Sequence, residues 1–257
     1  AKFILHFQEE KLAAPKYDAV LSTDQAEAFF IKYRELYDFD FKIKTSSAMS
    51  AAAMVSNKDR MLILKKGHKY SQHELNVLAH HEIGVHLVTT FNAIEQPLYI
   101  FGNGFPNNVE TQEGLAVMSE YMSGNLTLTR LKELAYRVIA SDSLIKGYSF
   151  ADTFDLIHGK YKLDRERAFN ITLRVHRGGG FTKDALYLSG LKKVYDLYKS
   201  NRSIDNMLLG KCSLEYDPII EKMKSLNLVL PAAHTARSFD QQMNTNPTID
   251  FILGHLK

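Results

Sequence analysis

Apolar and polar positions in the first quarter of the chain predict one helix followed by a small sheet. Aromatic residues recur at three-to-four-residue spacing over 24–39, which is typical of an amphipathic helix, and Thr23 precedes them as a helix cap. Residues 41–47 alternate between apolar and polar side chains, as a half-buried strand does. Residues 51–66 predict two strands around a turn at 57–59. Together these strands suggest a small antiparallel sheet.

From Ser71 onward the pattern is mostly helical. Ser71 and Glu74 form a capping-box sequence in front of residues 72–91, and apolar side chains cover that segment almost all round. We therefore expect it to be a buried central helix. The tail, 200–257, predicts short helices and extended pieces around prolines. The other expected helices are 112–123 (from a cap at Thr111 to a stop at Gly124), 130–141, 150–158, 165–176 and 183–199.

These elements predict an α+β fold: a mostly helical domain whose small antiparallel sheet flanks the central helix. The chain has 257 residues, 45% of them hydrophobic and 24% charged, which is ordinary globular composition. We expect residues 1–257 to form one domain. Within it, 1–67 would hold a helix and the sheet, 68–200 the central helices, and 201–257 a tail packed on the core.

Composition excludes several classes of function. The net charge of +3 is too small to argue for nucleic acid, and no basic stripe is interleaved with aromatic residues. No apolar run approaches the roughly 18 residues of a membrane span, and the first ten residues become charged too soon for a signal sequence. The single cysteine, Cys212, excludes a disulfide framework and fits a reducing compartment, so we expect a cytoplasmic protein.

Histidines are crowded into the predicted central helix. Five of the ten lie between residues 68 and 86, and the segment HHEIGVH has the spacing H-E-x-x-x-H. At about 100° per residue, imidazoles five positions apart on an α-helix diverge by roughly 140° and cannot face one ion. A wide π-type turn brings them back within about 50–60° of each other. Gly84, between the two histidines, makes such a distortion easier.

This cluster predicts a metal site with ligands His81 and His86. A histidine on an apolar helix is more often a bonded core residue, but two imidazoles and a carboxylate are costly to bury without a cation. A catalytic zinc has three protein ligands and an open position, so we expect a carboxylate from a neighbouring helix. Glu113 is our choice, because it falls in the first turn of the predicted helix, where Gly114 lets another backbone come close. Glu120 would then orient a histidine, and His80 is the competing ligand.

A third segment, RVHRGGGFTKDALYL, predicts an anion site. Glycines before a helix N-terminus expose backbone N–H groups, and basic residues lie next to them. The guest is either a phosphate or a peptide carboxylate, and the same residues also make an ordinary helix ending. His176 and Tyr187 are candidates to stabilise an oxyanion, although packing is the usual role of a tyrosine at that spacing. The candidates for binding the anion are Arg174, Arg177, Gly178, Gly179 and Lys183.

The segments LAHHEIGVHLVTTFNAIEQPL, TQEGLAVMSEYMSG and RVHRGGGFTKDALYLSGL occur in that order, within a resemblance that runs from about residue 40 to 200. They resemble the QEGLA-motif metallopeptidase family, which includes the microtubule-associated tyrosine carboxypeptidases of animals and the microbial flavohaemoglobin expression-modulating proteins. The resemblance implies a zinc-peptidase-like fold and a single catalytic metallopeptidase domain, 1–257, with the active-site helices in 68–200. It also implies that His81, His86 and Glu113 are zinc ligands and that Glu82 is the general base. Family members extend further at the N-terminus, so we expect this chain to lack part of that region.

The function expected from this resemblance is that of a Zn²⁺-dependent metallocarboxypeptidase. It would hydrolyse the C-terminal residue, tyrosine or another aromatic one, of a peptide or protein. The resemblance does not transfer tubulin as the substrate, because recognition of a protein tail depends on surfaces outside the three segments. The alternative is a regulatory protein that keeps the fold and the zinc but is not an enzyme. An intact Glu82 favours the enzyme, since a structural zinc needs no uncoordinated base.

Overall fold

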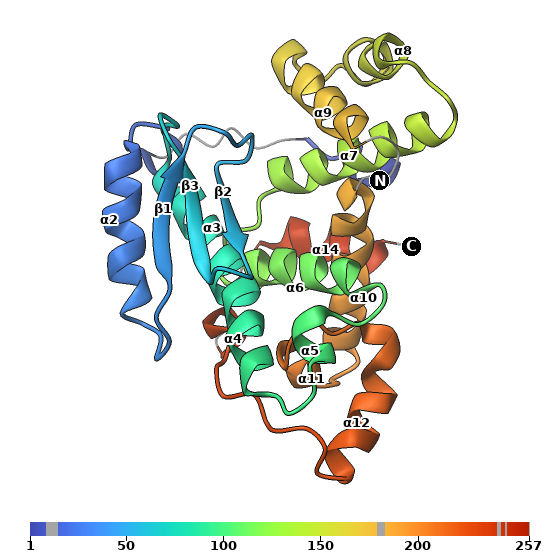
Figure 1. Cartoon of the computed structure of the whole chain (residues 1–257). Helices are drawn as coiled ribbons and strands as arrows, with labels where there is room; N and C mark the ends of the chain where they lie inside the picture. The colour runs from blue at the N-terminus through green and yellow to red at the C-terminus, as the bar shows by residue number, and fades with distance from the viewer. Residues whose placement is uncertain (9–14, 179–182, 241–242, 245, 257) are drawn as a thin grey trace.

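The computed structural model describes residues 1–8, 15–178, 183–240, 243–244 and 246–256. It confirms a mostly helical α+β fold, with the sheet and α2 at one side and long helices through the middle (Figure 1). No helix of the described residues is long and apolar enough to cross a membrane. The elements are α1 (Lys2–Leu5), α2 (Thr23–Arg34), β1 (Lys42–Ser46), β2 (Ala53–Ser56), β3 (Met61–Lys65), α3 (Gln72–Leu78), η2 (Ala79–Leu87), α4 (Val88–Glu95), α5 (Ile100–Asn103), α6 (Asn108–Met122), α7 (Leu128–Ile145), α8 (Phe150–Phe154), η3 (Asp155–Lys160), α9 (Arg165–Arg177), η4 (Lys183–Ala185), α10 (Leu186–Lys199), α11 (Asp205–Leu208), η5 (Leu214–Tyr216), α12 (Asp217–Ser225), α13 (Arg237–Asp240) and α14 (Pro247–His255), with a short 3₁₀ turn at Pro15–Tyr17.

Helix α2 begins one residue earlier than the sequence predicts. Ser22, not Thr23, is its cap: the Ser22 hydroxyl accepts the N–H of Gln25, and the Gln25 side chain accepts the N–H of Ser22. This reciprocal pair is a capping box. The Thr23 hydroxyl instead accepts the N–H of Gly67 at 3.0 Å, just beyond the last strand. The start of α2 is thereby tied to the sheet on which the helix packs.

The sheet is mixed, so the prediction of an antiparallel sheet is wrong for one strand pair. Strand β3 lies between β1 and β2; it is antiparallel to β2 and parallel to β1, with Ile43 opposite Leu62. The turn after β2 folds β3 back and inserts it between the first two strands, and that placement makes β1 and β3 run the same way. Local alternation of side chains marks strands but does not reveal this insertion.

Helix α6 is the most deeply enclosed element of the fold. Each of its residues from Thr111 to Met122 is buried, with η2 on one side and α10 on the other. It starts at Asn107, which has a left-handed backbone (φ 59°), one turn before the cap predicted at Thr111. The Thr111 hydroxyl accepts the N–H of Leu214 at 3.0 Å instead. The predicted end at Gly124 is confirmed by its positive φ of 71°.

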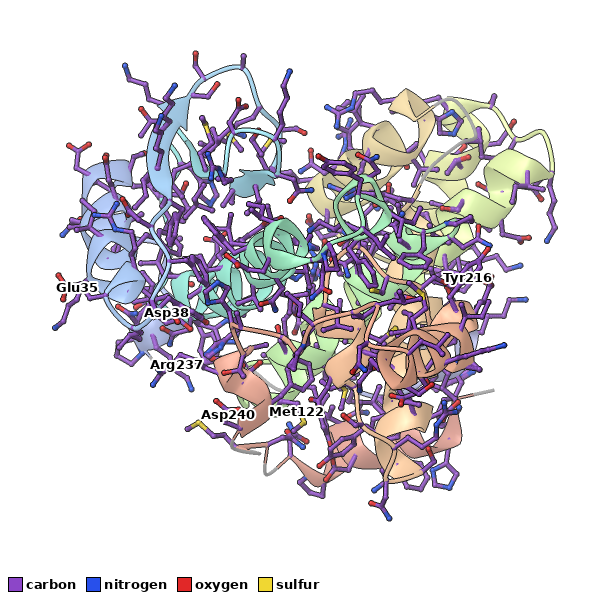
Figure 2. All side chains as sticks on the ribbon, turned by 60° about the horizontal axis from the view of Figure 1, so that its bottom comes forward. Glu35, Asp38, Met122, Tyr216, Arg237 and Asp240 are labelled. Carbon is purple, nitrogen blue, oxygen red and sulfur yellow. The ribbon has the colours of Figure 1, made fainter. Side chains whose placement is uncertain are left out.

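The C-terminal tail wraps back over the central helices. In α4, the Asn92 amide donates to the carbonyl of Leu208 and accepts the N–H of His234, both at 2.8 Å. Figure 2 shows Arg237 of the tail close to Asp38, and its guanidinium donates to the carbonyl of Leu36 at 3.1 Å. Tail residues also contribute apolar side chains to the largest hydrophobic cluster. The division into one catalytic domain with these internal limits stays a prediction.

Helices α6 and α10 approach each other through glycines. A Cβ added at Gly114 would lie 2.3 Å from the carbonyl carbon of Gly190, and one at Gly190 would lie 2.0 Å from the carbonyl oxygen of Glu110. Both obstacles are backbone atoms, which cannot rotate away. The sequence prediction that Gly114 lets another backbone come close is therefore confirmed, and the partner backbone is that of α10.

We expect Gly190→Ala to destabilise the protein by about 3 kcal/mol, because the new methyl group must push two buried helices apart. Urea unfolding followed by circular dichroism measures the change. Gly159→Ala is the control, since nothing lies within 4 Å of a Cβ there. Equal stability of the two variants would contradict this account of the α6–α10 contact.

Candidate metal centre

The central helix widens where the two histidines of the motif occur. Residues Ala79–Leu87 form the π-helix η2 between α3 and α4. His81 and His86 are therefore brought onto one side, with ring centroids 5.1 Å apart and ring planes at 78°. The wide turn that the five-residue spacing predicts is confirmed. The predicted cap at Ser71 is also present, because its hydroxyl accepts the N–H of Glu74 at 3.0 Å.

Helix α6 supplies the third group. Glu113 Oε2 lies 3.6 Å from Nε2 of His81 and 3.8 Å from Nε2 of His86. One ligand atom from each of these residues lies within 4.8 Å of the other two. The choice of Glu113 agrees with this geometry, but its predicted place in the first turn of the helix was wrong. Because α6 starts at Asn108, Glu113 lies in its second turn and not in its first.

The donor set fits a metal ion. Glu113 Oε2 is buried and has no hydrogen-bond partner among the described residues, although it faces two imidazole nitrogens. An orphaned carboxylate oxygen is costly in the interior, and a cation between the three groups would satisfy it. Burial lowers the pKa of His86 to about 3, which leaves its ring neutral and able to donate a lone pair.

His81 shows how strongly this position attracts a positive charge. Burial opposes its charged form, but the neighbouring carboxylates of Glu113 and Glu120 raise its pKa to about 9. Glu113 also has a pKa well below its ordinary value: burial opposes that shift, and the two histidines outweigh burial. Without a metal, a proton on His81 supplies the cation that the carboxylates require. A metal ion binding there would displace that proton.

Glu120 orients His81 from the far side of the ring. Nδ1 of His81 and Oε1 of Glu120 are 2.9 Å apart, and this contact places Nε2 toward Glu113. Glu120 is itself held by Arg130, whose Nε donates to Oε2 at 3.2 Å. The carboxylate–histidine pair fixes the tautomer and the ring direction, as in many metal sites. The sequence indicates Glu120 but gives no sign of Arg130, which lies three residues after Thr127, the cap of α7.

His80 does not join the cluster. Its Nδ1 lies 3.4 Å from the hydroxyl of Tyr33 on α2, and the two rings meet edge to face. Burial lowers the pKa of His80 to about 4. The competing ligand considered from the sequence therefore packs against the helix that covers the sheet.

Glu82 lies between the two histidines in sequence and is not one of the three clustered groups. Burial raises its pKa to about 7, the charge of His81 opposes that shift, and the charge of Glu113 adds to it. The charge of Glu82 also acts on the pKa of Lys211, another buried group. A carboxyl group with this pKa, next to a metal position but outside the ligand set, can exchange a proton near neutral pH.

Two residues from the third sequence motif cover Glu113. Lys183 donates to Oε1 of Glu113 at 2.6 Å while half of its side chain stays exposed. Tyr187, at the start of α10, is buried and stacks on the His81 ring with centroids 6.4 Å apart. Burial raises the pKa of Tyr187, so its hydroxyl keeps its proton. The fold thus brings residues from η2, α6 and α10 to one place.

The other basic residues of that motif have partners of their own. Arg174 pairs with the buried Asp184, and Arg177 donates to the Ser50 hydroxyl at 3.0 Å. Gly178 is the C-cap of α9 and has a right-handed backbone. Gly179 lies outside the described residues. The anion site predicted for this segment stays a prediction.

His176 lies away from the metal centre. Its Nε2 is 3.0 Å from the hydroxyl of Thr153, and its ring packs against Phe150 at 5.4 Å between centroids. Both partners belong to α8, which stands with α9 above the central helices (Figure 1). Of the two residues that the sequence offers for stabilising an oxyanion, only Tyr187 is placed beside the histidines.

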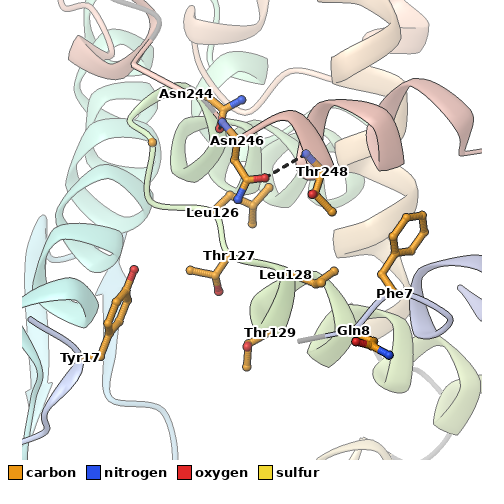
Figure 3. A pocket seen from close by; sticks show the side chains of 11 residues that line it. Phe7, Gln8, Tyr17, Leu126, Thr127, Leu128, Thr129, Asn244, Asn246 and Thr248 are labelled. Carbon is orange, nitrogen blue, oxygen red and sulfur yellow. Dashed lines mark hydrogen bonds between the residues drawn. The ribbon is translucent and has the colours of Figure 1, made fainter. Parts of the chain in front are cut away.

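A separate pocket lies where α7 and α14 begin (Figure 3). Asn246 caps α14 by accepting the N–H of Thr248 at 3.0 Å, and Thr127 caps α7 by accepting the N–H of Arg130 at 3.1 Å. Phe7 and Tyr17 add aromatic surface to its lining. None of the three clustered ligands lines this pocket, so it is distinct from the metal centre.

We expect Glu120→Gln to weaken metal binding by about 10-fold to 100-fold, because the neutral amide no longer polarises the His81 ring. Competition with a chromophoric chelator measures the dissociation constant. Glu110→Gln is the control, since Glu110 lies on the same helix and pairs with Lys193 at 2.6 Å instead. Unchanged affinity in Glu120→Gln would contradict the orienting role.

Residues 1–257, the whole chain, match the family described as microtubule-associated tyrosine carboxypeptidase. A comparison with curated proteins finds no match. The match agrees with the three sequence motifs and implies a carboxypeptidase-type function, with a peptide or protein as the substrate. The chain belongs to the microtubule-associated tyrosine carboxypeptidase family.

Proposed function

We propose that this protein is a zinc-dependent carboxypeptidase that removes the C-terminal residue of a peptide or protein. The observation that carries the proposal is the cluster of His81, His86 and Glu113, with Glu82 next to it as an additional carboxylate. Two imidazoles and one carboxylate form a donor set typical of catalytic zinc. The single buried cysteine fits work in a reducing compartment such as the cytoplasm.

The proposed chemistry is hydrolysis of an amide bond. When bound, zinc would polarise the scissile carbonyl and lower the pKa of a coordinated water toward about 7. Glu82 takes the proton of the attacking water and passes it to the leaving amine. The pKa of about 7 that burial gives Glu82 suits both transfers, since the group accepts and releases a proton near neutral pH.

Tyr187 and Lys183 are assigned to the substrate. The Tyr187 hydroxyl keeps its proton and its ring stacks on that of His81, so we assign it to donate to the oxyanion that forms at the scissile carbonyl. The Lys183 ammonium is half exposed and next to Glu113, which suits it to bind the terminal carboxylate of the substrate. Arg177 is exposed on the same motif and is a second candidate for that carboxylate.

The side chain removed is proposed to be aromatic, with tyrosine first, because the family carries that specificity in its description. Tubulin is not assigned as the substrate. A regulatory protein that binds zinc without catalysis would have no use for Glu82 outside the ligand set, so the enzyme is the better account.

We expect Glu82→Gln to retain metal and to lose about 100-fold to 10,000-fold in kcat/KM, because the proton acceptor is removed while the ligands remain. Incubation with a peptide library, read by mass spectrometry as loss of one C-terminal residue, measures turnover, and elemental analysis measures zinc. Glu95→Gln, an exposed change in α4, is the control. Normal cleavage by Glu82→Gln, or no cleavage by the zinc-loaded native protein, would refute the proposal.

Tyr187→Phe should lower kcat by about 100-fold and leave KM and zinc content nearly unchanged, because the hydroxyl acts only as charge develops on the oxyanion. Steady-state kinetics with one peptide identified from the library separates kcat from KM. Tyr195→Phe, two turns further along α10, controls for loss of a buried hydroxyl. Equal kinetics in the two variants would remove Tyr187 from the mechanism.

A further inference from the structure

Lys211 is a buried lysine in the segment between α11 and η5, and its side chain contacts η2. It is 8% exposed, and its Nζ donates to three oxygens. These are the carbonyl of His86 at 3.1 Å, the hydroxyl of Thr89 at 2.9 Å and the side-chain carbonyl of Gln112 at 3.5 Å. Lys211 thus contacts the backbone of a proposed metal ligand.

The partners of Lys211 are unusual for a buried ammonium group. Each of the three acceptors is neutral, and the ion pairs found among the described residues give Lys211 no carboxylate partner. Taking a charged group out of water costs several kcal/mol unless strong partners compensate. An apolar side chain would fill the same volume at less cost, so packing alone does not explain a lysine here.

The carbonyl that Lys211 contacts lies where the π-helix returns to an ordinary α-helix. His86 is the last residue but one of η2 (Ala79–Leu87). Besides Lys211, its oxygen accepts the hydroxyl of Thr90 at 2.7 Å. Two side chains therefore converge on one peptide group, and the orientation of that peptide sets where the His86 side chain starts.

The same network reaches the helix that carries Glu113. Gln112, the residue before Glu113, accepts the Thr89 hydroxyl at 2.9 Å and donates to the carbonyl of Gly210 at 3.2 Å. One buried set of hydrogen bonds thus joins η2, α4, α6 and the segment at 210–211.

We propose that Lys211 is a positioning residue for the metal centre. Together with Gln112 and Thr89, it fixes the His86 peptide relative to α6, so that the His86 imidazole and the Glu113 carboxylate meet at the distance a metal ion needs. This assignment rests on the proposed metallopeptidase function. It predicts that the network acts on metal affinity and geometry more than on the stability of the fold.

Lys211→Met tests this assignment, because it keeps most of the volume and removes the ammonium. We expect Zn²⁺ to bind about 10-fold to 100-fold more weakly, as for other groups that orient ligands. The absorption bands of the Co²⁺-substituted protein should change in energy or intensity, and kcat should fall more than KM rises. The melting temperature of the metal-free protein should stay the same or rise, since a buried charge has been removed.

Thr89→Val is a second variant that keeps the shape of the side chain and removes one member of the network. It should show a smaller change of the same kind, and it keeps the test decisive if Lys211→Met does not fold. Met207→Leu, a buried apolar change in α11, is the control and should leave Zn²⁺ affinity and the Co²⁺ spectrum unaltered.

Native affinity and a native Co²⁺ spectrum in folded Lys211→Met and Thr89→Val would overturn the assignment. So would a loss of metal that only follows a lower melting temperature of the metal-free protein. These results are distinct from failure of the proposed function. If the native protein binds zinc but cleaves no peptide, the metallopeptidase proposal fails while the affinity and spectrum still decide the role of Lys211.

Discussion

The five-residue spacing between His81 and His86 is the constraint on which the rest of the site depends. On a regular α-helix the two rings would point roughly 140° apart, and no choice of rotamers would bring both to one ion. The π-helix η2 removes that difference, and it does so inside the core, where the altered backbone must be supported from several sides. The neighbouring helices α4 and α6 and the segment around Lys211 supply hydrogen bonds to that region.

Electrostatics explains why such a costly arrangement is stable. Glu113 and Glu120 are buried on either side of His81, and of the two only Glu120 pairs with Arg130. Glu113 has the Lys183 ammonium on one carboxylate oxygen and two imidazoles near the other. That second oxygen has no hydrogen-bond partner among the described residues, which is why geometry and charge indicate the same place for a metal.

Much of this could be predicted from the sequence because the determining signals are local. Three such signals are the histidine spacing, the Ser71 cap and the position of Gly114 directly after Glu113. Each of them involves residues only a few positions apart. Long-range packing decided the rest. The insertion of β3 between the other strands and the left-handed Asn107 that starts α6 leave no periodic trace. His176 is drawn toward Thr153 by the way α9 packs, which helix periodicity does not specify.

The contact between α6 and α10 explains how metal ligands and substrate-facing residues come to share one site. Gly114 follows Glu113 directly, and it lets the backbone of Gly190 approach within the space that a methyl group would occupy. Gly190 lies one turn after Tyr187 on α10, so that the close approach of the two helices also sets the height of the Tyr187 ring over His81. A wider separation would move the hydroxyl away from the ligands while leaving both helices intact. The two glycines therefore contribute to the geometry of the site as well as to the packing of the core.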